Sequence, residues 1–222
     1  MQDAAGDVLV VFARYPEPGQ VKTRLARSLG EEAAASLYAA FVADLRQRFA
    51  AAPFAVRWAV APPDAGFAAR FGIAREHVFV QQGSDLGARM RQAIARLLDE
   101  GFARCAIIGS DMPQLAPGTV TDAFARLQQA DLVLGPADDG GYYLIAARAA
   151  LDVFDGIAWG TPSVLAATRG RAAELGLRLG LLAPGFDIDE GADLARLEAM
   201  LTHDAARATM PFTAAALNSL RR

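Results

Sequence analysis

The fold of this chain is decided by the stretch Leu132-Val133-Leu134-Gly135-Pro136-Ala137-Asp138-Asp139-Gly140-Gly141-Tyr142-Tyr143-Leu144-Ile145-Ala146. The apolar runs at its two ends, residues 132–134 and 142–146, predict two strands. Only seven residues separate these strands, whereas parallel neighbours need a crossover of roughly a dozen residues or more. The second strand is therefore expected to run antiparallel to the others or to leave the sheet.

The rest of the chain alternates between strand-like and helix-like segments, which is typical of an α/β fold. Apolar runs predict further strands at residues 8–12, 54–60, 78–80, 105–108 and 177–182. Apolar residues at helical spacing predict helices over residues 34–49, 86–97, 120–127, 162–175 and 194–201, and one helix in the tail beyond His203. We expect a mostly parallel central sheet with one reversed strand, and a ligand site at the carboxyl ends of its strands.

Length and composition limit the class of protein. A chain of 222 residues favours a single domain over residues 1–222, with 203–222 as a docked C-terminal tail. A net charge of −3 argues against a nucleic-acid partner, and no apolar run approaches the roughly 20 residues of a membrane span. The lone Cys105 and the acidic N-terminus, with Asp3 where an export signal carries basic residues, predict a cytoplasmic protein. The composition leaves the oligomeric state open.

The loop after the first predicted strand carries an unusual set of cations. It reads Ala13-Arg14-Tyr15-Pro16-Glu17-Pro18-Gly19-Gln20-Val21-Lys22-Thr23-Arg24-Leu25, and Lys22 is the only lysine among 22 lysines and arginines. A turn rich in Pro and Gly, followed by a helix starting near Lys22, suits an anion. The loop lacks the glycine spacing of a Walker A motif. We interpret it as a phosphate-binding loop with Arg14, Lys22 and Arg24; the alternative is an ordinary turn with solvated cations.

Two acidic segments follow later strands. Asp111, in Gly109-Ser110-Asp111-Met112-Pro113, comes directly after a buried strand and is well placed to hold a hard cation. Asp187 and Asp189 lie before the last predicted helix, and strand-like alternation would place both on the side that faces Asp111. A structural alternative is that Asp189 is the N-cap of that helix, with Asp193 in its first turn.

A third acidic segment, Asp138-Asp139-Gly140-Gly141, precedes the reversed strand. Asp-Gly is a common turn signal, so the segment can be a turn and nothing more. Adjacent glycines also let a ligand approach the backbone closely. Trp159 likewise has two readings, as the wall of an acceptor pocket or as part of the core.

Together these motifs resemble the glycosyltransferase-A-like (GT-A-like) transferases over about residues 8–202. The chain most resembles the family called radical-SAM/selenodomain-associated transferase 1, which is similar to phospholactate guanylyltransferase and to molybdenum cofactor guanylyltransferase. The motifs that carry the resemblance are Phe12-Ala13-Arg14-Tyr15-Pro16, Lys22-Thr23-Arg24-Leu25, Gly109-Ser110-Asp111-Met112-Pro113, Gly135-Pro136, Asp138-Asp139-Gly140-Gly141-Tyr142-Tyr143, Trp159 with Thr161-Pro162, and Asp187-Ile188-Asp189.

The resemblance implies a three-layer nucleotide-diphospho-sugar transferase fold, a nucleotide donor, and Mg²⁺ or Mn²⁺ held by acidic residues. The implied catalytic residues are Lys22, Arg24 and Asp111, and the implied metal ligands are Asp111, Asp187 and Asp189. The implied nucleotide-binding residues are Ala13, Arg14, Lys22, Arg24, Gln82, Gly83, Leu86 and Gly87. The implied acceptor-binding residues are Asp139, Gly140, Gly141, Tyr142 and Trp159. The guanylyltransferases have Gly-Thr-Asn where this chain has Gly141-Tyr142-Tyr143, which argues against a phospholactate-type acceptor.

The expected activity is therefore metal-dependent transfer from a nucleotide donor to a small-molecule acceptor. Two reactions fit the resemblance: nucleotidyl transfer from a nucleoside triphosphate, and glycosyl transfer from a nucleotide sugar. Neither needs a protein nucleophile, because fixed cations and a divalent metal stabilise the leaving group. A nucleotide-binding module without catalysis is the alternative from a different class.

Overall fold

The structure is a computed structural model that describes residues 6–63 and 66–220. Asp3, on which the expected absence of an export signal partly rests, lies outside the described residues. Within those two ranges, no helix is both long enough and apolar enough to cross a bilayer.

The described residues form one seven-stranded sheet with the order β3-β2-β1-β4-β6-β5-β7. Its strands are β1 (Asp7–Ala13), β2 (Ala55–Val60), β3 (Val78–Val80), β4 (Arg104–Gly109), β5 (Leu132–Pro136), β6 (Tyr142–Ala147) and β7 (Leu179–Leu181). Of these seven, β6 alone is antiparallel to its neighbours, β4 and β5, and the other pairs are parallel. The predicted mostly parallel sheet with one reversed strand is confirmed, and the reversed strand is the one that the seven-residue connection leads into.

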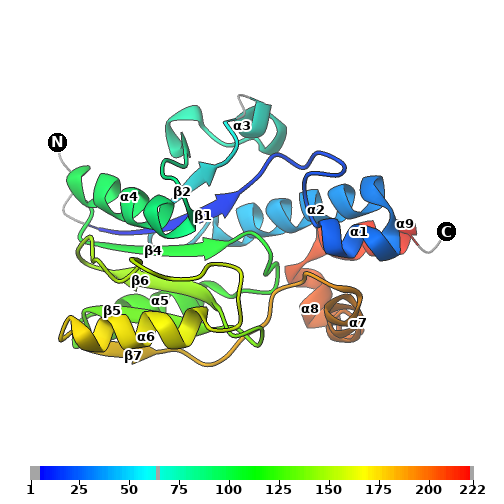
Figure 1. Ribbon diagram of the computed structural model, residues 1–222. Helices are drawn as coiled ribbons and strands as arrows, with labels where there is room; N and C mark the ends of the chain where they lie inside the picture. The colour runs from blue at the N-terminus through cyan, green and yellow to red at the C-terminus, as the bar shows by residue number, and fades with distance from the viewer. Residues whose placement is uncertain (1–5, 64–65, 221–222) are drawn as a thin grey trace.

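Helices cover both faces of the sheet (Figure 1). They are α1 (Thr23–Leu29), α2 (Glu31–Phe49), α3 (Gly66–Phe71), α4 (Leu86–Asp99), α5 (Pro117–Arg126), α6 (Val164–Glu174), α7 (Gly191–Met200), α8 (Asp204–Thr209) and α9 (Pro211–Leu220), with the short 3₁₀ helix η1 (Arg75–His77). Val8 and Val10 of β1 pack with α4 and α6 on one face, while Leu9 and Val11 pack with α2 and α5 on the other. Because both faces are buried, β1 is a continuous apolar run.

The tail differs from its prediction as a single helix. It forms two helices, α8 and α9, separated by Met210, whose backbone leaves the helical region at φ −134° and ψ 55°. Pro211 follows, and a proline has no N–H with which to continue the preceding helix. The carboxylate of Asp44 on α2 accepts hydrogen bonds from the backbone N–H groups of Phe212 (3.0 Å) and Thr213 (2.8 Å), which docks the start of α9 on the body.

Two short elements were not predicted, α3 and η1. With six and three residues respectively, they are shorter than the windows in which helical periodicity is recognisable. Helix α3 buries Phe67 against Trp58 of β2, with ring centroids 5.8 Å apart. It therefore extends the core beside the edge of the sheet that β2 and β3 form.

Candidate active site

A cleft of about 680 Å³ opens at the carboxyl ends of β1, β2, β3 and β4. Ala13, Ala61, Gln81 and Gly109, at or just beyond those strand ends, line it. Its volume is typical of small-molecule sites, which span roughly 300–1,000 Å³. The cleft lies at the edge of the sheet where the topology places ligands.

Lys22 is the centre of the charged part of this cleft. Its Nζ lies 2.8 Å from Asp111 Oδ1 and 3.4 Å from Asp189 Oδ1, and only 3% of its side chain is exposed. Arg24 donates to the other oxygen of Asp189 at 3.1 Å. Lys22, Asp111 and Asp189 therefore meet at one point. They come from the loop after β1, the loop after β4 and the segment before α7, respectively.

The charge of Lys22 is kept by its partners. Burial by itself would lower the pKa of this ammonium, but the nearby carboxylates, Asp111 first, outweigh that effect and the pKa is raised above its ordinary 10.5. Lys22 therefore stays positively charged throughout the physiological pH range. An ammonium held at the strand ends is a fixed partner for an anionic ligand.

The predicted N-cap role of Asp189 is wrong. The N-cap of α7 is Glu190, in a capping box with Asp193. The Asp193 carboxylate accepts from the backbone N–H groups of Asp189 (3.1 Å) and Glu190 (2.8 Å). Because the capping box is formed by the side chains of Glu190 and Asp193, the side chain of Asp189 is free to contact Lys22 and Arg24.

Asp187 and Asp189 each share a cavity with Asp111, but not the same one. Asp187 lines a small cavity of about 80 Å³ together with Asp111 and Tyr143, whereas Asp189 lines the larger cleft. Ile188, fully buried between them, donates its N–H to the carbonyl of Asp111 at 2.9 Å. The segment is not a strand, so the expected alternation that would place both carboxylates on one side does not hold.

Burial raises the pKa of Asp187 from 3.8 to about 6, and the carboxylates of Asp139 and Asp111 add to the effect. The folded protein therefore binds this proton more tightly than the unfolded chain. The resulting contribution to stability is complete below about pH 4 and is lost as the pH rises through about 6.

Asp187→Asn should therefore gain stability relative to the parent as the pH rises from about 4 to about 7, because the variant has no carboxyl to ionise in a buried place. Melting temperatures of the two proteins, measured by circular dichroism across that pH range, test this. Melting curves that shift in parallel at every pH would contradict it.

Tyr38, one of the residues whose spacing predicted the helix over 34–49, is a buried residue of the site. Its hydroxyl lies 2.7 Å from Ser110 Oγ and accepts from the backbone N–H of Arg14 at 2.9 Å. Burial, followed by the charge of Asp111, raises the pKa of this phenol, so it stays protonated. Tyr38 thereby ties the loop after β1 to the loop after β4. Its apolar helical spacing concealed this polar role.

The predicted nucleotide-binding residues divide into two groups. Ala13, Arg14 and Leu86, like Lys22 and Arg24, line the cleft. Those that do not are Gln82, Gly83 and Gly87. Gln82 lines a separate depression beside α4, and Gly83 packs against the backbone of Ala88 and Arg89.

The side chains that line the cleft near these positions are Gln81 and Arg89. The amide of Gln81 donates to the carbonyl of Ala59 at 2.8 Å and to that of Ala13 at 3.5 Å. Both partners are carbonyl oxygens, which only accept hydrogen bonds, so the orientation of the amide is determined. In the run Gln81-Gln82 the sequence offers no signal for which glutamine faces the cleft.

The predicted acceptor segment is held by its own turn. Asp139 accepts from the backbone N–H of Gly141 at 2.8 Å, as in an Asx turn. Gly140 has φ +87°, and a Cβ added there would collide with the carbonyl of Pro162. Gly140 is thus required by close backbone packing, and none of Asp139, Gly140 and Gly141 lines the cleft.

Tyr142 and Trp159 pack on the face of the sheet that α4 and α6 cover. Their rings contact edge to face with centroids 6.5 Å apart, and the Trp159 ring also lies against Gly87, where an added Cβ would be 2.6 Å from it. The hydroxyl of Tyr142 is buried. Because neighbouring strand residues face opposite sides, it is Tyr143 that lines the small cavity of Asp111 and Asp187, with its hydroxyl donating to the carbonyl of Ala183 at 3.0 Å.

The acidic residues fit a divalent cation as a pair. No three acidic, His or Cys side chains in the described part of the chain are arranged to hold a metal by themselves, so the predicted trio of Asp111, Asp187 and Asp189 does not form one cluster. Asp111 and Asp189, however, bring two carboxylate oxygens to the same ammonium. Mg²⁺ is commonly held by one or two carboxylates together with substrate phosphates, and this pair meets that requirement.

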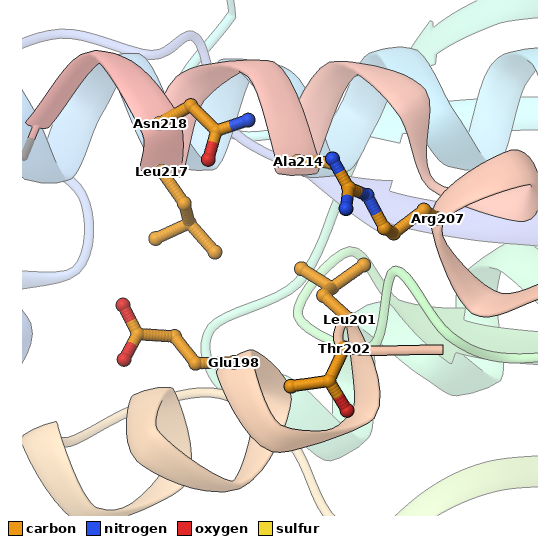
Figure 2. Close-up of a pocket in the computed structure, with 7 residues that line it drawn as sticks. All are labelled: Glu198, Leu201, Thr202, Arg207, Ala214, Leu217 and Asn218. Atoms are coloured by element: carbon orange, nitrogen blue, oxygen red, sulfur yellow. The ribbon is translucent and has the colours of Figure 1, made fainter. Parts of the chain in front are cut away.

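A second, smaller pocket of about 180 Å³ lies between α7, α8 and α9. Figure 2 shows Leu217 of α9 and Leu201, the residue that follows α7, pointing toward each other across it, with Glu198 and Arg207 at its sides. None of the predicted site residues lines this pocket, and it is remote from the strand ends. We therefore assign the site to the cleft.

A mostly parallel sheet with one reversed strand, and acidic and basic side chains gathered at its strand ends, define a transferase with the GT-A-like fold. The chain is 34% identical, with a TM-score of 0.88, to a structure from Desulfovibrio desulfuricans G20 provisionally described as a nucleotide-diphospho-sugar transferase, and the match covers 98% of this chain and 97% of that one. The chain belongs to the family described as uncharacterized protein conserved in bacteria (DUF2064), whose profile matches residues 44–161.

Two more distant structures share the fold. A CMP:2-keto-3-deoxy-manno-octonic acid synthetase complexed with CTP is 12% identical, with a TM-score of 0.55 over 89% of this chain and 99% of that one. The 4-diphosphocytidyl-2C-methyl-D-erythritol synthase of Anaerococcus prevotii is 8% identical, with a TM-score of 0.58 over 90% and 97%. No curated protein matches the sequence. The resemblance to GT-A-like transferases is thus confirmed.

Proposed function

We propose that the protein is a metal-dependent nucleotidyltransferase, which transfers a nucleotide from a nucleoside triphosphate to a small-molecule acceptor and releases pyrophosphate. It would act in the cytoplasm, where nucleoside triphosphates and Mg²⁺ are abundant. The acceptor would present a phosphate or a carboxylate, whose oxygen attacks the α-phosphorus while the bond to the pyrophosphate oxygen breaks.

The charge of the cleft carries this proposal. Four cationic side chains line it, Arg14, Lys22, Arg24 and Arg89, against the two carboxylates of Asp111 and Asp189. A divalent metal on the carboxylates would raise the excess of positive charge further. A nucleoside triphosphate brings about two more negative charges than a nucleotide sugar, so it is the donor that this excess fits better.

The protein groups would act by position and charge. Lys22 and Arg24 would meet the donor phosphates and stabilise the negative charge that develops on the leaving pyrophosphate. Tyr38 would hold the loops that carry Arg14 and Asp111 at a fixed separation, through its contacts to Arg14 N–H and Ser110. No covalent intermediate with the protein is needed, since the acceptor itself supplies the nucleophile.

Asp111 and Asp189 would hold Mg²⁺ or Mn²⁺, with Asp187 close by in the small cavity that it shares with Asp111. When bound, the metal supplies positive charge that offsets the charge of the donor phosphates and orients them. Asp187, Tyr143 and Asp111 line the small cavity beside the cleft. That cavity, together with the turn that Asp139 closes, is where we place the acceptor.

Glycosyl transfer from a nucleotide sugar is the second candidate. It is favoured by the similarity, at 34% identity, to the structure provisionally described as a nucleotide-diphospho-sugar transferase. In that reaction an acceptor hydroxyl attacks the anomeric carbon and a nucleoside diphosphate leaves. The same residues would bind the diphosphate.

A thermal-shift panel separates these candidates. Nucleoside triphosphates and nucleotide sugars of several bases are each added with and without Mg²⁺ or Mn²⁺. A ligand at about 100 times its Kd stabilises the folded state by about 2.7 kcal/mol, which is a clear shift in melting temperature. We expect the largest metal-dependent shift with a triphosphate. A larger shift with nucleotide sugars would favour glycosyl transfer, and no shift with any nucleotide would refute a nucleotide donor.

Lys22→Ala and Arg24→Ala should each weaken binding of the best triphosphate by roughly tenfold or more, because each removes a charge-assisted contact worth about 1.5–3 kcal/mol. Calorimetric titration of the two variants measures the loss. Arg196→Ala is a matched control, since it removes an exposed arginine that pairs with Asp138 at 2.7 Å outside the cleft. Unchanged affinity in both cleft variants would contradict the phosphate-binding role of this loop.

A further inference from the structure

Lys22 stands where a divalent cation would bind. Its ammonium contacts one oxygen of Asp111 at 2.8 Å and one of Asp189 at 3.4 Å, and Arg24 occupies the second oxygen of Asp189 at 3.1 Å. The carboxylate pair that would hold the metal is therefore already neutralised by the chain itself. A metal ion and the ammonium would compete for the same two oxygens.

The backbone of Lys22 is held in an uncommon conformation. Lys22 has φ 48° and ψ 43°, and among the described residues it is the one position other than glycine with a positive φ. A non-glycine residue is strained in this left-handed region and persists there only when its surroundings hold it. The carbonyl of Lys22 accepts the N–H of Ala26 at 2.8 Å, and the two carboxylates hold the side chain.

Without a nucleotide, this competition favours the ammonium of Lys22 over the metal ion. A divalent cation that approaches the empty cleft meets an ammonium, and bringing two positive charges together is unfavourable in a buried place. When donor phosphates enter the cleft, they give the ammonium a new anionic partner. A lysine can make this exchange because it is a compact charge on a flexible four-carbon chain.

We propose that Lys22 is an internal counter-ion that blocks the Asp111–Asp189 metal position until a nucleotide arrives. This inference rests on the proposed function and adds to it a mode of regulation. Metal and nucleotide would bind with positive coupling, because each makes room for the other at Lys22, and the coupling is equal in both directions. In the absence of nucleotide, the protein would then bind a divalent metal only weakly.

Titration of the free protein with Mn²⁺ alone, followed by the electron paramagnetic resonance of the unbound ion, tests this. The parent should bind Mn²⁺ weakly. Lys22→Met, which keeps the length of the side chain without its charge, should bind Mn²⁺ roughly tenfold more tightly or better, within the usual range for coupled sites. The double variant Lys22→Met/Asp111→Asn should lose that gain.

Lys22→Gly is a second variant, because glycine adopts a positive φ without strain and so protects the result from a folding defect. Arg126→Met is the matched control: it removes an exposed arginine that pairs with Asp122 at 3.0 Å outside the cleft and leaves Lys22 and Arg24 in place, and should bind Mn²⁺ as weakly as the parent. The inference would be overturned if the parent bound Mn²⁺ tightly in the absence of nucleotide, or if both Lys22 variants bound it weakly. The nucleotide panel on the parent reports on the proposed function separately.

Discussion

Asp111→Asn is expected to abolish the gain in nucleotide affinity that Mg²⁺ or Mn²⁺ provides. The substitution preserves the shape of the side chain but removes the negative charge that a hard cation needs, so the affinity for the best triphosphate in the presence of metal should fall by at least about tenfold. Asp189→Asn should have the same effect. Calorimetric titration of Mn²⁺ in the presence of that triphosphate is the measurement.

The same two variants should remain folded. The Asp111 side chain is 40% exposed and that of Asp189 is 35% exposed, whereas their partner Lys22 is only 3% exposed. Either variant leaves this buried ammonium with one carboxylate partner, so the loss of stability should be roughly 1–2 kcal/mol, more than for a pair exposed on both sides. Asp189→Asn also leaves the capping box of Glu190 and Asp193 intact. If Asp111→Asn bound metal as tightly as the parent, the metal-centred mechanism would have to be abandoned.

Asp44→Ala is expected to destabilise the protein by about 2 kcal/mol, because it leaves the backbone N–H groups of Phe212 and Thr213, at the start of α9, without their acceptor. The Asp44 carboxylate is only 1% exposed, and both of its oxygens accept backbone N–H groups at the start of α9. Its loss should loosen α9 before the sheet unfolds. Urea denaturation measures the first effect, and hydrogen exchange of residues 211–220 measures the second.

Asp122→Ala is the matched control for that experiment. Asp122 is an aspartate on the surface of α5, 49% exposed, which pairs with Arg126 one helical turn later at 3.0 Å. Removal of such a pair costs only about 0.2–0.5 kcal/mol. Equal losses in the two variants would show that Asp44 does not anchor the C-terminal helix.

The amino-acid sequence by itself determined that the sheet is mostly parallel with one exceptional strand, and at which edge of the sheet the site lies. Seven residues between two apolar runs do not allow a parallel crossover, so β6 had to be reversed or to leave the sheet. The structure shows that it stays in the sheet, antiparallel to β4 and β5. Asp111 follows a buried strand directly, and Lys22 follows another through one short loop. Parallel strands bring their carboxyl ends to one edge, so these residues were predictable members of one site.

Only the tertiary structure decided which side chains meet. The contact of Lys22 with Asp189 joins residues 167 positions apart in the sequence, and no local sequence pattern specifies a contact between residues so far apart. The division of Asp187 and Asp189 between two cavities depends on Ile188, which is anchored to the carbonyl of Asp111. Local patterns record which faces of an element are buried, whereas the choice of contact partner depends on how separate elements pack. The partners of the Tyr38 hydroxyl and of the Asp44 carboxylate beneath α9 were decided in the same way.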